Sequence, residues 1–195
     1  MTEALVREPL RRALASRALH EPTLGNGTAS AVLIPLFERR GEVHLWFVRR
    51  PEGMRRHGGQ VAFPGGKADP SDASPLATAL REAHEEIGLP PSSVDVLGRM
   101  EDLSTITGFA ITPYVAWLRP EQDGAEWVPE PNPAEVARVF AAPLALFLEP
   151  PTGVPPLRGY KCEGEFVWGA TAAMSRRLGE VLRGNALRQS GGPAQ

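Results

Sequence analysis

The sequence has one cysteine, little net charge and no long apolar run, and each shortage excludes a class of protein. Cys162 is the only cysteine in 195 residues, so neither an internal disulfide nor a cysteine zinc cluster is possible. The formal net charge of -2 offers no basic field for nucleic acid or an anionic membrane surface. The longest apolar runs, such as AVLIPLF, fall far short of the roughly 18 residues of a membrane helix. We therefore expect a cytoplasmic protein without nucleic-acid or membrane partners.

The length suits a single domain over residues 1–195. Strand and helix signals alternate without an internal repeat, which predicts a fold of the α/β or α+β class. A turn at Arg40 and Gly41 joins the first two predicted strands, so we expect a hairpin there. The predicted strands cover residues 29–39, 41–50, 60–66, 94–100, 110–118, 135–144 and 164–169.

Helices are predicted near both ends of the chain. The spacing of Leu10, Leu14 and Ala18 indicates a short packed helix at the N-terminus. A second helix is predicted over residues 170–182, and residues 187–195 read as a frayed tail.

A third helix, over residues 75–87, has clear start and stop signals. Ser74 can cap it, Pro75 suits its first position, Gly88 is a good C-terminal stop and Pro90 prevents continuation. At about 100° per residue, two stripes form along this helix. The apolar stripe contains Leu76, Ala79, Leu80, Ala83 and Ile87, and the acidic stripe contains Glu82, Glu85 and Glu86.

The acidic stripe works against local stability. Like charges three or four residues apart on a helix cost about 0.2–0.5 kcal/mol per pair when exposed. That cost is small enough for an ordinary solvated acidic face. Arg81 stands four residues before Glu85 and can pair with that carboxylate.

The segment before this helix points to chemistry instead. FPGGKADPSD contains two glycines, Gly65 and Gly66, that permit close backbone approach, and two further carboxylates, Asp69 and Asp72. Carboxylates clustered without histidine or cysteine suit hard divalent cations, Mg²⁺ or Mn²⁺. Magnesium that keeps several waters is usually completed by a phosphate-bearing substrate. The leading hypothesis is metal-assisted phosphoryl chemistry on a small molecule.

Residues 66–89 resemble the signature of the Nudix hydrolases: glycine, five residues, glutamate, seven residues, then Arg-Glu-apolar-x-Glu-Glu-x-Gly-apolar. The second half is matched in full by Arg81, Glu82, Ala83, Glu85, Glu86, Gly88 and Leu89. The first half departs, with Asp72 in place of the glutamate and one extra residue before Arg81. The role of Asp72 is therefore open.

The preceding segment, VRRPEGMRRHGGQVAFPGG, is similar to that of the coenzyme A pyrophosphatase subgroup. The matching positions are Arg50, Arg55, Gly59, Phe63, Pro64, Gly65 and Gly66. Pro51 departs from the small residue expected there. The two motifs together span about 40 contiguous residues, and this subgroup's box carries the same one-residue expansion.

The resemblance implies a Nudix fold, a mixed β-sheet sandwiched between α-helices. It implies hydrolysis of the pyrophosphate of coenzyme A to 3',5'-ADP and 4'-phosphopantetheine, with the acyl or oxidised forms of coenzyme A as further candidate substrates. Glu82, Glu85 and Glu86 would bind Mg²⁺ or Mn²⁺, and Arg81 would orient Glu85. The general base is not identified. Glu135 is a second candidate for it, beside the plainer interpretation of a surface carboxylate at a strand edge.

The arginines near residue 50 have two interpretations, a solvated rim or a phosphate site. Arginine's planar fork matches phosphate oxygens, and coenzyme A carries a 3'-phosphate besides its pyrophosphate. Arg50 and Arg55, with Gly65 and Gly66, are the predicted substrate-binding residues. Weaker candidates for phosphate contact are Arg49, Arg56 and His57.

Two aromatic residues complete the predictions. Phe63 is expected in the core. Trp168 is interpreted as core, with adenine stacking as its alternative.

Three alternatives remain. The same helix would serve a Nudix enzyme acting on ADP-ribose or a dinucleoside polyphosphate. A catalytically silent nucleotide-binding module would keep the fold without the chemistry. A structural domain with an acidic helix would gain no stability from divalent metal. A homodimer is also possible, but no stretch identifies its interface.

Overall fold

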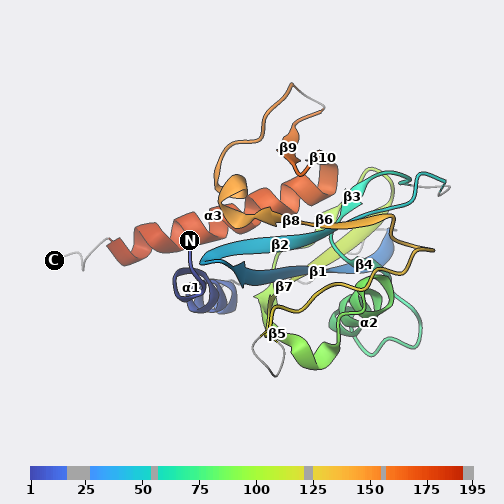
Figure 1. Cartoon of the computed structure of the whole chain (residues 1–195), viewed down its shortest axis with the longest axis horizontal. Helices are drawn as coiled ribbons and strands as arrows, with labels where there is room; N and C mark the ends of the chain where they lie inside the picture. Colours follow the sequence, from blue (N-terminus) through green and yellow to red (C-terminus); the bar gives the residue numbers. More distant parts are fainter. Residues whose placement is uncertain (17–26, 54–56, 121–124, 155–156, 191–195) are drawn as a thin grey trace.

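The computed structural model describes residues 1–16, 27–53, 57–120, 125–154 and 157–190. A mixed sheet lies between helices on its two faces (Figure 1), which confirms the predicted fold class. The helices are α1 (Glu3–Ala15), α2 (Pro75–Ile87) and α3 (Gly169–Ser190), with short 3-10 helices η1 (Pro91–Ser93) and η2 (Leu144–Leu148). The strands are β1 (Thr28–Arg39), β2 (Glu42–Arg49), β3 (Val61–Ala62), β4 (Gly65–Lys67), β5 (Val94–Arg99), β6 (Leu103–Ser104), β7 (Phe109–Leu118), β8 (Arg138–Pro143), β9 (Gly159–Cys162) and β10 (Glu165–Trp168).

The main sheet has the strand order β3-β2-β1-β7-β5. Its centre is the parallel pair of β1 and β7, and the other pairings are antiparallel. β4 pairs with β1, β6 with β7 and β8 with β2, while β9 and β10 form a separate hairpin. Eight consecutive residues of β1 are buried, as expected for a strand covered on both faces.

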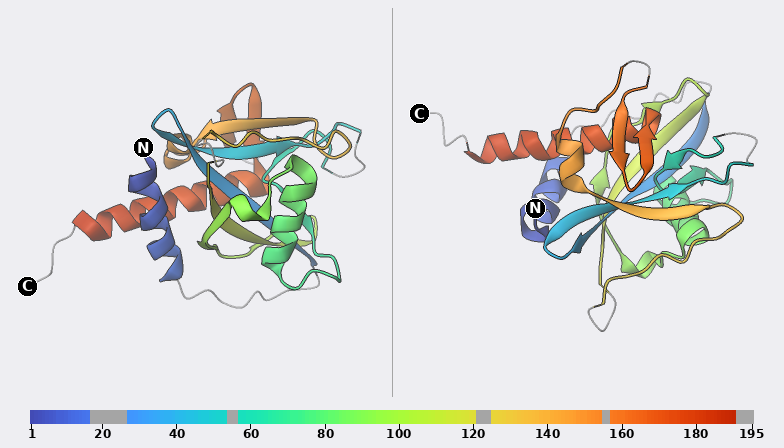
Figure 2. Two further views of the ribbon diagram at one scale, coloured as in Figure 1. Left: turned by 60° about the horizontal axis from the view of Figure 1, so that its bottom comes forward. Right: turned by 45° about the horizontal axis from the view of Figure 1, so that its top comes forward.

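Two apolar layers cover the two faces of the sheet, and the helices that pack on them are seen in Figure 2. Ile34 and Leu36 of β1 pack in the layer that includes α1 and α3. Leu33 and Phe37 pack in the layer that includes α2. Successive side chains of a strand point to opposite faces, so the alternation along β1 places α2 across the sheet from α1 and α3.

The predicted hairpin of β1 and β2 is confirmed, with Arg39 opposite Glu42. Its two turn residues, Arg40 and Gly41, have φ of 53° and 79°. Positive φ at both positions is the geometry of the type I′ turn, whose twist matches that of the flanking strands. Val43, Leu45 and Phe47, which alternate along β2, are all buried.

Helix α2 has the predicted bounds. The Ser74 hydroxyl accepts a hydrogen bond from the Ala77 N–H at 3.1 Å, and Gly88 ends the helix in the left-handed conformation with φ of 72°. The apolar stripe packs on the sheet through Ala79, Ala83 and Ile87, all fully buried.

Two predicted strands were wrong in extent. Residues 60–66 form two short strands, β3 on β2 and β4 on β1, because the chain crosses from one partner to the other around Pro64. The strand predicted from residue 135 begins at Arg138, since Glu135 and Val136 donate backbone N–H groups to Asn132 in a turn. β6 and β9 were not predicted.

Helix α3 extends beyond the predicted residue 182 and continues to Ser190. Its backbone therefore covers residues 187–190, where a frayed tail was predicted. Residues 191–195 lie outside the described residues, as does Ala18 at the other end of the chain. Within the described part, no helix has the length and hydropathy to span a membrane.

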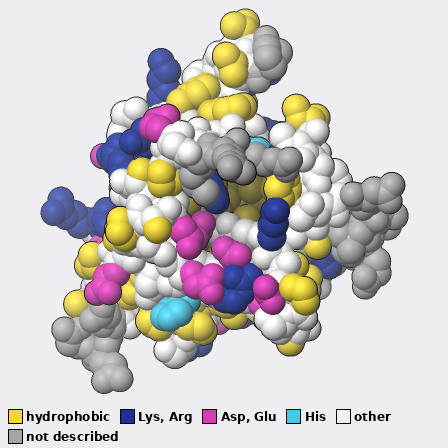
Figure 3. Space-filling view, turned by 90° about the vertical axis from the view of Figure 1, so that its right-hand side faces the viewer, with side chains coloured by type: hydrophobic (Ala, Val, Ile, Leu, Met, Phe, Trp, Pro, Cys, Tyr) yellow, Lys and Arg dark blue, Asp and Glu magenta, His cyan; other side chains and the backbone are white. Residues whose placement is uncertain are grey.

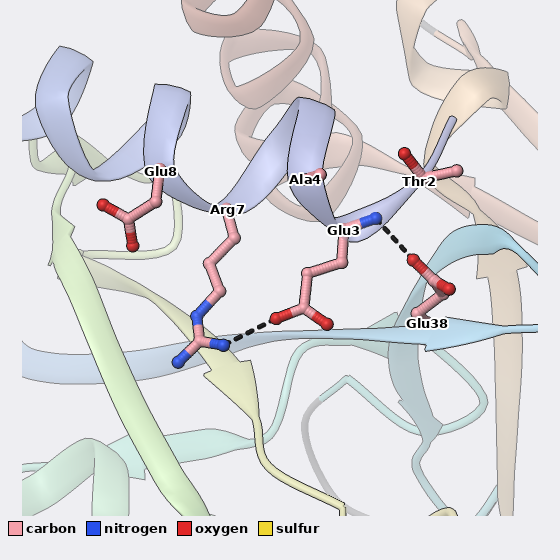
Figure 4. Close-up of a pocket in the computed structure, with 6 residues that line it drawn as sticks. All are labelled: Thr2, Glu3, Ala4, Arg7, Glu8 and Glu38. Atoms are coloured by element: carbon pink, nitrogen blue, oxygen red, sulfur yellow. Dashed lines mark hydrogen bonds and ion pairs between the residues drawn. The ribbon is translucent and has the colours of Figure 1, made fainter.

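Helix α1 is attached to β5 by ion pairs, in addition to the packing of its buried residues Leu10 and Leu14. Arg7 and Arg11 each donate to one carboxylate oxygen of Asp95 at 2.6 Å. A shallow depression lies at the start of this helix, and its lining is Thr2, Glu3, Ala4, Arg7, Glu8 and Glu38 (Figure 4). Its acidic groups are already bonded: Glu3 accepts from Arg7, and Glu38 accepts from the backbone N–H of Glu3.

Candidate active site

Acidic side chains gather beside a hollow in the end of the molecule where α2 lies (Figure 3). Hydrophobic side chains form part of the hollow, and lysine or arginine side chains stand around it. The predicted acidic stripe of α2 does not lie evenly in solvent. Glu86 is 1% exposed, the side chain of Glu82 is 15% exposed and that of Glu85 is 48% exposed.

Glu86 is a buried carboxylate, and its neighbours only partly offset the cost of burying its charge. Its Oε2 accepts the backbone N–H of Gly65 at 3.0 Å, and its Oε1 lies 3.5 Å from Nη1 of Arg50. Burial raises the pKa of Glu86 to about 7, and the hydrogen bond from Gly65 and the charge of Arg50 only partly oppose it. The predicted substrate residue Arg50 therefore reaches the acidic site rather than a solvated rim.

The two glycines of β4 make room for this arrangement. Gly65 has φ of 153°, and a Cβ there would lie 2.4 Å from the carbonyl oxygen of Ala31. A Cβ on Gly66 would lie 2.4 Å from the carboxyl carbon of Glu82. The glycines thus serve backbone geometry, as predicted, and they allow the carboxylate of Glu82 to lie against the strand. The pKa of Glu82 is raised, chiefly by burial.

Arg81 ties the carboxylates of α2 to the loop that precedes it. Its Nη1 donates to Oε1 of Glu82 at 3.0 Å and to Oε2 of Glu85 at 2.8 Å, so the pair with Glu85 forms as its spacing predicts. Its Nη2 also donates to the carbonyl of Lys67 at 3.1 Å. One guanidinium therefore contacts two of the three predicted metal ligands.

Asp72 holds the other side of that guanidinium. Both of its oxygens accept from Arg81, Oδ1 from Nε and Oδ2 from Nη2, each at 3.0 Å. Oδ2 also accepts the hydroxyl of Thr78 at 2.8 Å and the backbone N–H of Asp69 at 2.9 Å. The Arg81 hydrogen bonds are the largest cause of the pKa of Asp72 lying well below its usual range. Asp72, which departs from the family's signature, thus anchors Arg81.

Glu135 lies much closer to the site than its sequence position indicates. One carboxylate oxygen from each of Glu82, Glu86 and Glu135 lies within 4.8 Å of the other two. Glu135 comes from a turn before β8 and not from a strand edge. Glu85 is not part of this group of three and points its carboxylate to Arg81. The name "carboxylate cluster" is used below for Glu82, Glu86 and Glu135.

The carboxylate cluster fits a divalent cation. Two unit charges about 4.8 Å apart repel by roughly 3 kcal/mol at an effective dielectric constant of about 20. Oxygen ligands without nitrogen or sulfur suit Mg²⁺ or Mn²⁺. The space left by Gly66 lets the Glu82 carboxylate lie against β4, within 4.8 Å of the other two. A bound cation would remove the repulsion, so the donor set and its charge agree with the predicted metal.

The other residues predicted to contact phosphate do not share the position of Arg50 beside the acidic site. Arg49 lies 3.2 Å from Glu52 and 3.6 Å from Glu165, so it is occupied by carboxylates. His57 shares a hydrogen bond of 2.9 Å with Gln60. Arg55 and Arg56 lie outside the described residues.

The two aromatic predictions have different outcomes. Phe63 is 1% exposed, which confirms its place in the core. Trp168 is 37% exposed, so the core interpretation is wrong for it. Its position on the short hairpin β9–β10 leaves the side chain partly uncovered.

Known proteins are similar to this chain in sequence and in fold. The NUDIX domain family matches residues 27–161. The "Uncharacterized Nudix hydrolase NudL" of Yersinia enterocolitica is 43% identical over 178 residues, covering 84% of this chain and 88% of that protein. Its namesake from Escherichia coli K12 is 39% identical over 164 residues, covering 78% and 82%.

Solved structures agree on the fold. A NUDIX hydrolase from Alicyclobacillus acidocaldarius superposes with a TM-score of 0.56 at 20% identity, over 86% of this chain and 99% of that one. RenU, a Nudix hydrolase from M. smegmatis, has a TM-score of 0.54 at 17% identity, over 86% and 89%. The family match covers most of the chain and includes α2 with its carboxylates. The chain therefore belongs to the Nudix family and is a Nudix hydrolase.

Proposed function

We propose that this enzyme hydrolyses the pyrophosphate bond of coenzyme A, and of its acyl or oxidised forms, to 3',5'-ADP and 4'-phosphopantetheine. The observation that carries the proposal is the arginine-glycine segment that leads into the site. This segment resembles that of the coenzyme A pyrophosphatases, and its first arginine, Arg50, lies 3.5 Å from Glu86.

The carboxylates of α2 are the proposed ligands of Mg²⁺ or Mn²⁺. Glu82 and Glu86 offer half-buried and buried oxygens, and Glu85 offers an exposed one beside them. When bound, such cations neutralise phosphate oxygens and help to generate the attacking hydroxide. Arg81 limits the motion of Glu82 and Glu85 through its hydrogen bonds. Glu135 is a candidate to accept the proton of the attacking water, as is one of the glutamates of α2.

Substrate contacts are assigned to the loop and strand beside the cluster. Arg50 and Arg55 would contact phosphate oxygens, and Gly65 and Gly66 would let the substrate approach the backbone of β4. Arg50 pairs with Glu86, and this contact with a proposed metal ligand supports its assignment to the pyrophosphate. Trp168, with its partly uncovered ring, is available to stack on adenine.

A second candidate is another nucleoside diphosphate derivative, such as ADP-ribose or a dinucleoside polyphosphate. The Ap4A hydrolase of C. elegans has a similar fold, with a TM-score of 0.53, but at 13% identity this similarity does not identify the substrate of this chain. A catalytically silent nucleotide-binding module is the remaining class. The residues of α2 argue against it. Arg81 is hydrogen-bonded to Glu82 and Glu85, and Glu86 accepts the backbone N–H of Gly65, so the acidic site is complete.

The test is a product assay by mass spectrometry. The purified chain is incubated with Mg²⁺ or Mn²⁺ and, separately, coenzyme A, ADP-ribose, diadenosine polyphosphates and nucleoside triphosphates. Metal-dependent formation of 3',5'-ADP and 4'-phosphopantetheine supports the proposal. Cleavage of another compound but not of coenzyme A would support the metal site and exclude coenzyme A as the substrate. Absence of cleavage for every compound would favour a nucleotide-binding module.

The 3'-phosphate gives a sharper test of the arginines. Arg55→Ala is expected to weaken the use of coenzyme A by about tenfold, the scale of one charge-assisted phosphate contact. Dephospho-coenzyme A, which lacks the 3'-phosphate, should be affected less. Equal losses for the two compounds would assign Arg55 to the pyrophosphate or to the fold.

A further inference from the structure

Residues 127–137 lead into β8 and pass beside α2 (Figure 1). We call them the crossing segment. Both of its ends are fixed. Trp127 is 8% exposed and Val136 is 3% exposed, and the backbone N–H of Ala137 donates to the carbonyl of Arg49 at 2.8 Å. Between these ends it carries Glu135, the member of the carboxylate cluster that does not come from α2.

The crossing segment is bonded to the last turn of α2. The backbone N–H of Glu130 donates to the carbonyl of Ile87, and that of Asn132 donates to the carbonyl of Glu86, each at 2.9 Å. The last carbonyls of a helix lack partners within the helix, so these bonds satisfy groups that would otherwise need water. Gly88 allows the close approach, because a Cβ there would lie 3.1 Å from Cβ of Glu130.

Asn132 joins this attachment to the turn that holds Glu135. Its side-chain Oδ1 accepts the backbone N–H of Ala134 at 3.1 Å, a short-range bond typical of asparagine in turns. Its carbonyl accepts the N–H groups of Glu135 at 3.0 Å and Val136 at 2.8 Å. The same residue therefore bonds to the backbone of Glu86 on one side and shapes the turn of Glu135 on the other.

Such a device is needed because the carboxylates of the cluster repel one another. Without a cation, the electrostatic repulsion falls when Glu135 moves away from Glu82 and Glu86, so such a movement is favoured. The tip of the Glu135 turn, Pro133 and Ala134, is exposed, so burial holds only the side of the turn that follows Glu135, at Val136. A carboxylate that must already be close when a cation arrives needs a backbone that keeps it there, and this is the meaning of preorganisation in a binding site.

We propose that Asn132 is a positioning residue, which fixes the turn of Glu135 to α2 so that three carboxylates from two distant segments form one cation site. The inference rests on the proposed metal-dependent function. It extends that function by making the affinity of the cation depend on an uncharged side chain that does not touch it.

The test measures binding of Mn²⁺ alone, without substrate, by electron paramagnetic resonance on the full chain. Asn132→Ala keeps the backbone bond to Glu86 but removes the Oδ1 bond to Ala134. We expect its dissociation constant for Mn²⁺ to rise about tenfold, the scale seen when a group that orients metal ligands is lost. Asn132→Ser keeps an acceptor oxygen of the kind that caps such turns and should recover most of the affinity.

Two controls separate positioning from a general loss of structure. Glu130→Gln changes an exposed side chain of the same segment and keeps its backbone N–H, so Mn²⁺ binding should not change. Glu135→Gln removes the positioned carboxylate itself. When this change is already present, Asn132→Ala should weaken Mn²⁺ binding no further, because the two residues act as one unit.

The outcomes are distinct. An Asn132→Ala chain with unchanged Mn²⁺ affinity, or with a loss that simply adds to that of Glu135→Gln, overturns the inference and leaves the hydrolase proposal intact. If the unmodified chain cleaves no compound of the substrate panel but Asn132→Ala still shows the expected loss of Mn²⁺ affinity, the proposed function is overturned and the inference is supported. Should Asn132→Ala not fold, Asn132→Gln, which displaces the acceptor by one methylene, is expected to show the same loss.

Discussion

Two acidic regions of the molecule bring together side chains from distant parts of the chain, with opposite electrostatic results. On β5, Asp95 accepts from Arg7 and Arg11 of α1. Burial raises the pKa of Asp95, but the hydrogen bonds from both arginines outweigh it and the net pKa is lowered. In the carboxylate cluster, burial is the largest cause and the nearby charges of Glu82 and Glu135 contribute, and together they hold the pKa of Glu86 at about 7.

The difference separates a structural contact from a functional one. Two cations around one anion stabilise the attachment of α1. Three anions around one point cost stability, and a fold retains such a cost where it serves binding or catalysis. The residue types are similar in the two regions, so the count of opposite charges around each carboxylate distinguishes them.

The largest expected effect is on turnover at the cluster. Glu86→Gln should lower turnover by at least about 100-fold, because losing a metal ligand costs no less than losing one of the groups that orient it. The amide has nearly the same volume, so the fold should remain. Steady-state rates on the identified substrate and circular dichroism check this. An unchanged rate would remove Glu86 from the ligands and weaken the contrast with Asp95.

The pH dependence of stability should differ next. With a chelator present, the folded pKa of Glu86, about 7, lies above the ordinary value of 4.5 for a glutamate. The native state therefore binds more protons between these values, and the free energy of unfolding should fall as pH rises from about 4.5 to 7. The upper limit of this fall is about 3 kcal/mol. Urea denaturation at several pH values measures it.

Glu86→Gln serves as the matched control for that experiment. The variant has no carboxyl group to titrate at this position, so its stability should be flatter across the same range. Saturating Mn²⁺ should also flatten the wild-type curve, since the cation favours the ionised carboxylate. Identical slopes for the two chains in chelator would show that Glu86 is not the titrating group.

Asp95→Asn should have a smaller effect and a different readout. Loss of the charge weakens the hydrogen bonds to Arg7 and Arg11 and should lower the free energy of unfolding by about 1–2 kcal/mol. Because the folded pKa of Asp95 is lowered, its stabilisation is present above the unfolded pKa and is lost as pH falls through the folded one. Turnover at neutral pH should stay normal. A loss of turnover without a loss of stability would break the comparison.

The smallest expected effect concerns the start of α2. Ser74→Ala removes the acceptor for the Ala77 N–H and should cost about 1 kcal/mol of stability. Glu82 and Glu86 stand in later turns of the helix, so turnover should be retained. Ser92→Ala, at an exposed serine outside α2, is the control. Equal stability of the two variants would argue that the cap contributes nothing here.

Local signals predicted the parts of the fold that depend on nearby residues. Ser74, Pro75 and Gly88 mark the ends of α2, and the structure places the helix ends there. Arg40 and Gly41 predicted the first hairpin. In contrast, β6 has two residues and is a strand only because β7 pairs with it. No local pattern can reveal a strand whose stability comes from a distant partner.

The candidate site was predictable to the same extent. The spacing of Arg81 and Glu85 led to their ion pair, and the resemblance identified the acidic helix. The anchoring of Arg81 by Asp72 was left open, since the extra residue between them changes the loop in a way that only its fold can show. The short turn NPAE did contain a signal, because asparagine before proline and alanine favours a turn, but a turn does not say what it faces.

The sequence by itself determined the family, the acidic helix with its ends, and the type of ion that its carboxylates suit. These follow from residue type and from spacing within one segment, where the geometry of a helix is known in advance. Only the tertiary structure decided that Glu86 is buried beside Gly65 and Arg50, that Glu85 is exposed, and that Glu135 completes the cluster. Burial and the approach of distant charges set the pKa and the energy of each carboxylate, and both depend on segments that meet only when the sheet is assembled.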